Sequence, residues 1–168
     1  VILAHHDYAE KHGGGGRGIS IGMEFGEPDI VPKSNFDHNP YIIYNDISSA
    51  DLNFYKNLME FPAIANKPLK SPIASGSALS YSYEYVETFY DGKRKIHKVK
   101  VKPIIRTEAL FNGVLYIEDS TWALSAVDLS INREAIQFCK DFKIIQNYKQ
   151  IDTNVYVPVR REITYTIR

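Results

Sequence analysis

The chain has 168 residues, of which 44% are hydrophobic and 24% are charged, a composition typical of one globular domain with a core of its own. Twenty acidic and twenty basic residues give a formal net charge of zero. A neutral chain lacks the positive field that nucleic-acid binding requires, so no nucleic-acid partner is expected.

Residues 1–40 differ from the rest and are expected to form a flexible or irregular N-terminal segment. Apolar residues on one side predict a short helix over residues 1–11, and the four consecutive glycines at 13–16 end it. Neither a Lys-Ser/Thr pair nor a third spaced glycine follows, so these glycines do not indicate a phosphate-binding loop. A short strand is predicted over residues 19–25, followed by an irregular proline-containing connection.

One group of side chains in this segment has metal-ligand character. It consists of His5, His6, Asp7 and His12. Adjacent histidines point to different sides of a helix, and no pair four residues apart supplies two nitrogens to one ion. We therefore expect surface histidines, no metal site and no cofactor.

Residues 41–168 are expected to form one antiparallel β domain. A short strand is predicted over residues 41–44. Three prolines exclude a continuous helix or a central strand over residues 61–77, because proline lacks an N–H donor and restricts the residue before it. We expect this stretch to cross the sheet as a long loop.

Residues 79–90 alternate with period two, which predicts a half-buried strand. The aromatic face of this strand would carry Tyr81, Tyr83, Tyr85 and Phe89. Asp91-Gly92 predicts a two-residue type I′ hairpin, because both residue types tolerate positive φ. The following strand, residues 93–103, is crowded with lysine and arginine. We interpret it as a solvated strand face or a charged edge, with contact to anionic lipid or a partner as the alternative.

Four further strands are predicted over residues 110–118, 122–127, 136–148 and 155–167. Gly113 indicates a bulge or a close approach of another segment, and Pro158 indicates an edge or a bulge. Trp122 is interpreted as a core anchor with its indole N–H near the rim. The fold class is therefore mainly β, an antiparallel meander that forms a curved sheet or incomplete barrel.

Several of these pieces, in this order, resemble a known family. They are Ser-Pro at 71–72, the Asp-Gly hairpin, Lys-x-Lys-Pro at 100–103, and residues 113–122 leading to Val-Asp at 127–128. Together they resemble the uncharacterised domain that follows a carboxypeptidase-regulatory-like domain in large outer-membrane proteins of Gram-negative bacteria, over roughly residues 50–168. The resemblance implies a periplasmic or outer-membrane-associated location and, as partners, other domains of the same protein.

The sequence pattern over residues 113–128 is also similar to the strand pair of lipoprotein-localisation carriers. Those proteins fold as an incomplete antiparallel barrel that holds acyl chains under a lid. An apolar ligand or a lipid is therefore an alternative partner. The surplus of aromatic strand residues supplies a candidate ligand lining, formed by Tyr81, Tyr83, Tyr85, Phe111, Leu115 and Trp122.

The preferred functional hypothesis is a non-catalytic periplasmic module, structural or partner-binding through its curved sheet. The first alternative is a carrier-like lipid-binding domain. The second is a hydrolase with a carboxylate-based site. Its candidate residues would be Glu84, Glu87, Glu108, Glu118, Asp119 and His97. Glu84 and Glu87 are predicted on opposite strand faces and no hydrolase motif occurs, so no catalytic residue is assigned. The single cysteine, Cys139, is interpreted as structural.

Overall fold

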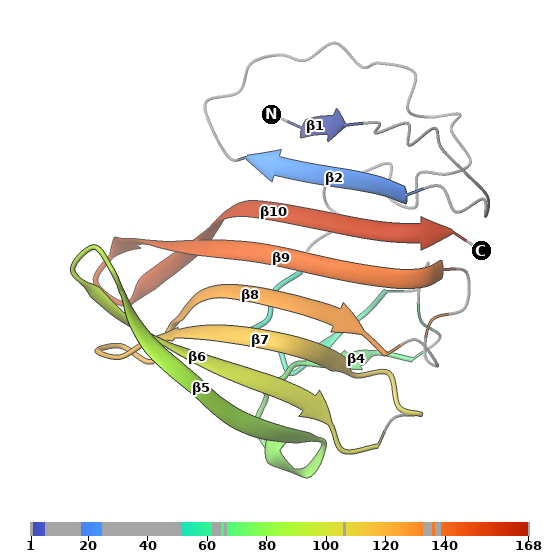
Figure 1. Ribbon diagram of the computed structural model, residues 1–168, viewed down its shortest axis with the longest axis horizontal. Coiled ribbons are helices and arrows are strands. Elements are labelled where there is room, and N and C mark those ends of the chain that lie inside the picture. The colour runs from blue at the N-terminus through green and yellow to red at the C-terminus, as the bar shows by residue number, and fades with distance from the viewer. Residues whose placement is uncertain are drawn as a thin grey trace.

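The computed structural model describes residues 2–5, 18–24, 52–61, 65, 67–105, 107–132, 136 and 139–167. The strands are β1 Ile2–His5, β2 Gly18–Glu24, β3 Leu58–Met59, β4 Leu69–Lys70, β5 Tyr81–Asp91, β6 Arg94–Pro103, β7 Phe111–Glu118, β8 Leu124–Ile131, β9 Cys139–Asp152 and β10 Val155–Ile167, with a 3-10 turn, η3, at Ser77–Leu79. Eight of them form one antiparallel sheet in the order β1-β2-β10-β9-β8-β7-β6-β5 (Figure 1). The strands at its two ends do not pair with each other, so the predicted open, curved meander is confirmed.

The N-terminal part of the chain adds two strands to this sheet. β1 pairs with β2, and β2 pairs with β10. The prediction of a helix is therefore wrong for Ile2–His5, whereas β2 confirms the predicted strand. The glycine run, the predicted strand at 41–44, His6, Asp7, His12 and the side chain of His5 lie outside the described residues.

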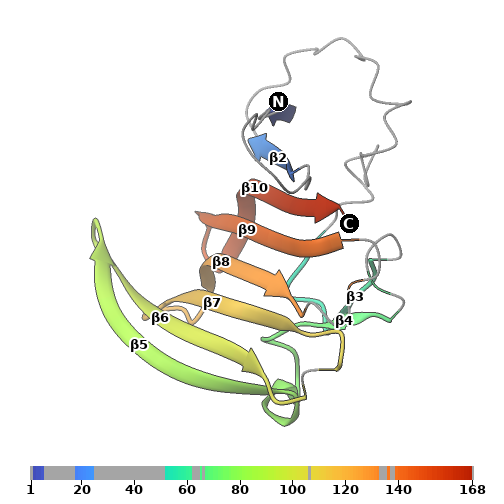
Figure 2. The same ribbon diagram turned by 45° about the vertical axis from the view of Figure 1, so that its right-hand side comes forward.

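The described part of residues 52–80 packs against one face of the sheet, here named the covered face. Figure 2 shows β3 and β4 on that side, while the β5–β6 hairpin curves away from them. The segment contributes the buried side chains Leu52, Phe54, Met59, Phe61 and Leu69. The sheet contributes Tyr81, Val101, Phe111, Leu115, Val127, Leu129, Phe142, Ile144, Ile163 and Tyr165. The described part of the proline-rich stretch thus crosses the sheet as predicted, and it seals the core.

A β-bulge at Val86 changes which residues of β5 share a face. Before the bulge, Tyr85 pairs with Val99. After it, Glu87 pairs with the adjacent residue Lys98. Because neighbouring residues of a strand point to opposite faces, the alternation of β5 is inverted beyond the bulge.

Two sequence predictions fail for this reason. Phe89 does not share the covered face with Tyr81, Tyr83 and Tyr85, but pairs with Ile96 on the opposite face, here named the open face. Glu84 and Glu87, predicted on opposite faces, both lie on the open face. A single extra residue on one strand is enough to produce both errors.

The β5–β6 turn begins one residue later than predicted. Asp91 still pairs with Arg94, so the loop consists of Gly92 and Lys93. Gly92 has a φ of 63°, and Lys93 does not share the positive φ. A glycine with positive φ at the first loop position is typical of a type II′ turn, so the predicted type I′ turn is wrong.

The last two strands hold two further residues discussed above. Cys139 is buried in the core, as expected of a structural residue. A register shift between Pro158 and Arg160 confirms the bulge that the proline indicated. β10 lies between β9 and β2, so this proline-containing strand is internal to the sheet.

Tyr81→Phe is expected to destabilise the protein by about 1–3 kcal/mol, because it leaves two buried backbone groups without their partner. The Tyr81 hydroxyl donates to the carbonyl of Lys70 at 2.5 Å and accepts from the N–H of Phe111 at 3.0 Å. Burial raises the pKa of this phenol. Urea unfolding measures the loss, and Tyr83→Phe, whose hydroxyl lies nearer to solvent, is the control. Equal losses in the two variants would contradict this assignment.

Candidate functional site

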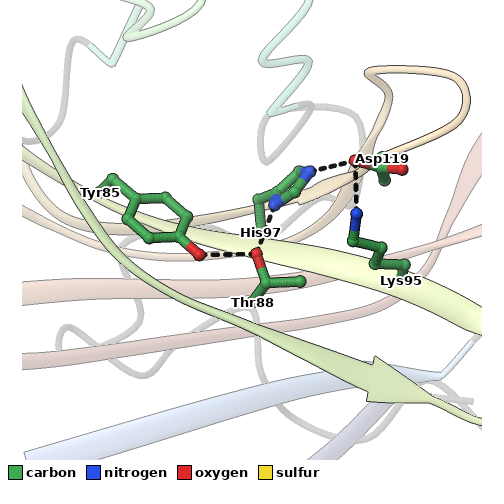
Figure 3. Close-up of polar contacts among 5 residues, drawn as sticks. All are labelled: Tyr85, Thr88, Lys95, His97 and Asp119. Atoms are coloured by element: carbon green, nitrogen blue, oxygen red, sulfur yellow. Dashed lines mark hydrogen bonds and ion pairs between the residues drawn. The ribbon is translucent and has the colours of Figure 1, made fainter.

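A cluster of polar side chains lies where the β5–β6 hairpin meets the β7–β8 turn (Figure 3). We name it the His97 cluster; its members are Tyr85, Thr88, Lys95, His97 and Asp119. The turn is held beside β6 because Ile96 pairs with Glu118 and the N–H of Asp119 donates to the carbonyl of Lys95 at 2.9 Å. Sheet pairing therefore brings Asp119 beside β6.

The members form one continuous chain of hydrogen bonds. Nδ1 of His97 lies 2.6 Å from Oγ1 of Thr88, and Nε2 lies 2.5 Å from Oδ1 of Asp119. The hydroxyl of Tyr85 lies 2.8 Å from the same threonine oxygen. A neutral imidazole satisfies this chain when Nε2 donates to the carboxylate and Nδ1 accepts from the threonine. Because both ring nitrogens are engaged, the imidazole is held in one orientation.

Asp119 is the negative end of this chain. The hydrogen bond from His97, assisted by the charge of Lys95 3.4 Å away, lowers the pKa of the Asp119 carboxyl. The carboxylate is therefore anionic at neutral pH. Its side chain is 41% exposed, so solvent screens the contacts that it makes.

Trp122 completes the site from the β7–β8 turn. Its ring stacks on His97, with centroids 5.9 Å apart and an interplanar angle of 22°. The side chain is 73% exposed and the backbone φ is 58°, so the prediction of a core anchor is wrong. The chain reverses at this point, with the N–H of Trp122 bonded to the carbonyl of Glu118. Positive φ costs a bulky residue about 1–2 kcal/mol.

The exposed rings of Tyr85 and Trp122 lie beside the ring of His97, and the three rings are here named the aromatic platform. Tyr85 is 63% exposed and its ring centroid lies 6.4 Å from that of His97. The side chain of His97 is only 17% exposed, so this ring mainly supports the other two. Tyr85 and Trp122 therefore present the aromatic surface to solvent.

The six predicted ligand-lining residues fall into two groups. Tyr81, Phe111 and Leu115 are buried in the core. Tyr83, Tyr85 and Trp122 are exposed, and the hydroxyl of Tyr83 donates to the carbonyl of Pro72 at 2.7 Å. Contact of these residues with a ligand stays a prediction.

Among the six candidate residues for a hydrolase, the structure brings His97 and Asp119 together. Glu84 and Glu87 form ion pairs with lysines of β6. Glu118 is buried and accepts a hydrogen bond from the hydroxyl of Tyr156 at 3.2 Å, and Glu108 is exposed.

Sequence reasoning missed Thr88 as the partner of His97. The hairpin register places these two residues opposite each other because the loop is Gly92-Lys93 and not the predicted Asp91-Gly92. The signal in the sequence was the hairpin turn, from which pairs can be counted outward only when the two loop residues are known.

The open face of the sheet contains a broad hollow of about 820 Å³. Its floor includes the side chains of Tyr116, Ala126 and Ile145. Phe89 packs edge-on against Tyr116, with centroids 6.1 Å apart. Lys149 and Gln150 of β9 and Asp91 and Arg94 of the β5–β6 hairpin also line it. Asp128 and Asn147 lie opposite Ile145 and Ala126, so the hollow is lined by apolar and polar side chains together.

The described residues contain no group of three or more side chains that could hold a metal ion. They also contain no helix of the length and apolar character needed to cross a membrane.

These features define an open antiparallel sheet. One of its faces is covered by a segment of the same chain, and an exposed aromatic surface lies beside that segment. The chain belongs to a family of unknown function, DUF5686, which matches residues 30–168. Neither the curated proteins nor the solved structures yielded a match to the chain.

Asp119→Asn is expected to lower the midpoint of urea unfolding at neutral pH, with a difference from wild type that shrinks below about pH 4. The pKa of Asp119 is lowered in the folded state. The carboxylate therefore stabilises the fold above its unfolded pKa, and this contribution is lost as the pH falls through the folded pKa. Circular dichroism across pH 3–7 measures the effect. In a His97→Gln background the difference should be reduced; an equal difference at all pH values would contradict the assignment.

Proposed function

We propose that this chain is a non-catalytic module on the periplasmic side of the bacterial outer membrane, where its curved sheet binds a partner segment. The resemblance of residues 50–168 to an envelope domain supports this location. Other domains of the same outer-membrane protein are the partners that the resemblance implies.

The aromatic platform is the observation that carries the binding role. Binding energy in protein interfaces is concentrated in a few exposed Trp, Tyr and Arg side chains. Here the imidazole is fixed through both nitrogens, and Trp122 is stacked on it in a costly backbone conformation. A rigid aromatic surface loses little conformational entropy when it binds. These properties favour recognition of a partner over a purely structural role.

Photo-crosslinking in the full-length protein, in its own bacterium, tests this proposal. A photoreactive amino acid at position 122 is expected to give an adduct of defined mass in the outer-membrane fraction. The control position is Ile104, which is 55% exposed just past the end of β6, at the opposite end of that strand from the β5–β6 hairpin. Recovery of the protein outside the envelope, or equal crosslinking at both positions, would count against the proposal.

The carrier-like alternative is favoured by the hollow on the open face, whose lining includes apolar side chains. Native mass spectrometry of the gently purified protein, followed by organic extraction and lipid analysis, separates the two functions. A stoichiometric acyl-chain adduct would favour the carrier. A clean mass without adduct would favour the interaction module.

The hydrolase alternative is favoured by the series of hydroxyl, imidazole and carboxylate in Thr88, His97 and Asp119. The arrangement differs from that of serine hydrolases, because the hydroxyl contacts Nδ1 and the carboxylate contacts Nε2. Labelling by a fluorophosphonate probe that is lost in Thr88→Ala and retained in Thr88→Ser would support this alternative.

A further inference from the structure

The outer edge of β5 is the end of the sheet on the side of the aromatic platform. β5 pairs with β6 on one side, and no strand among the described residues pairs with its other side. From Ser82 to Glu87 every side chain is exposed. An edge strand of this kind presents unpaired N–H and C=O groups that a further strand can use.

The open face of β5 carries negative charge. Of its residues on that face, Glu84, Glu87 and Asp91 are acidic. The ion pairs with β6 engage one oxygen of each glutamate, since Nζ of Lys102 lies 3.2 Å from Oε2 of Glu84 and Nζ of Lys98 lies 3.0 Å from Oε1 of Glu87. These glutamate side chains remain 63% and 55% exposed, so each can accept a second cation from the outer side.

The other face of β5 carries exposed aromatic rings. Tyr83 and Tyr85 lie there opposite Val101 and Val99 of β6. Aromatic residues pair favourably with β-branched or aromatic neighbours on the next strand. The inner neighbour β6 shows this pattern already, because it alternates lysine with valine over Lys98–Lys102.

We infer that the outer edge of β5 binds an extended partner segment in which lysine or arginine alternates with β-branched or aromatic residues. The segment would pair with residues 82–85, which precede the bulge, and place a cation beside Glu84 and near Glu87. A second copy of β5 is disfavoured, because it would bring carboxylates close to carboxylates. This inference rests on the proposed partner-binding function and specifies the chemistry of the partner.

Titration of the whole chain into labelled peptides tests the inference. One peptide has the sequence KVKVKV and the other has EVEVEV. The wild-type protein is expected to bind the lysine peptide about tenfold more tightly than the glutamate peptide. A few favourable cross-strand charge pairs together give a difference of about this size. The Glu84→Lys/Glu87→Lys variant is expected to reverse this preference. Asp141→Lys/Asp152→Lys, with the same change in net charge at exposed positions of β9, is expected to retain it.

Hydrogen exchange of the complex locates the binding site. Alternate amides of β5 are expected to gain protection when the lysine peptide binds, because those N–H groups point away from β6. The inference would be overturned if both double variants kept the wild-type preference for the lysine peptide. It would also be overturned if the amides that gain protection were confined to the residues that line the hollow. Crosslinking at position 122 together with failure of both peptide tests would overturn the β5 inference and leave the proposed function standing.

Discussion

Gly113→Ala is expected to destabilise the protein by about 3 kcal/mol or more, because the new methyl group has no space and its backbone conformation is strained. The Cβ would lie 2.1 Å from the carbonyl oxygen of Asp128 and 3.0 Å from Cα of Leu129. Both atoms belong to the backbone of β8, so no side-chain rotation relieves the overlap. The φ of 153° adds strain, since a residue with a Cβ rarely adopts it. The neighbouring strands β7 and β8 would have to separate.

Urea unfolding of this variant should be compared with Gly92→Ala. Gly92 also has positive φ, at 63°, but a Cβ there meets nothing within 4 Å. This control is expected to lose about 1–2 kcal/mol, the conformational cost alone. If the two variants lost the same stability, the close approach of β7 and β8 would not be the cause.

Arg161→Met is expected to destabilise the protein by roughly 3 kcal/mol, because it removes two charge-assisted hydrogen bonds from the core. The residue is 4% exposed. Its Nε donates to Oε1 of Gln146 at 2.8 Å and a terminal nitrogen donates to the carbonyl of Leu52 at 3.4 Å. The charge of Arg161 also opposes the burial that raises the pKa of Tyr148, so its removal should raise that pKa further.

The neighbouring Arg160→Met is the matched control. Arg160 lies on the open face and forms an ion pair with Glu162 at 3.3 Å, with 54% of its side chain exposed. Its loss is expected to cost less than about 1 kcal/mol. A double variant, Arg161→Met with Gln146→Leu, is expected to differ from the sum of its single variants, because the two residues bond to each other and share the carbonyl of Leu52 as an acceptor. Strict additivity would show that the two residues do not form one network.

The order and identity of the strands beyond residue 79 could be predicted, because each depends on local chemistry. Residues 110–118 alternate regularly, and the structure has β7 at Phe111–Glu118 with Phe111 and Leu115 toward the core. Gly113 marked a close approach, which the contact with Asp128 confirms. Such features need only period-two patterning and the conformational properties of single residues.

The bulge at Val86 could not be predicted, because it depends on how two strands align. It moved Phe89 to the other face. Pro158 indicated an edge or a bulge, but the sequence did not show that the register beyond it places Arg161 opposite Gln146 on the covered face. One unpaired residue reverses the face to which every later side chain points. An error in the predicted register therefore becomes an error in which residues are predicted to be buried.

The His97 cluster was hidden from the sequence for a related reason. Asp119 reaches His97 only because β6 and β7 pair so that Ile96 lies opposite Glu118. Trp122 was taken for a core residue because large apolar side chains usually are. Its position in a turn with positive φ exposes the ring to solvent, and no local sequence pattern distinguishes such a tryptophan from a buried one.

The segment of residues 52–80 acts, in effect, as a ligand that the protein carries within its own chain. Phe54 packs on Phe111 with ring centroids 5.4 Å apart, and Phe61 packs on Phe142. Any apolar molecule that binds this face must therefore displace a segment of the same chain, which is present at high effective concentration. The contacts that form the core of this protein are thus the same contacts that keep apolar ligands off its covered face.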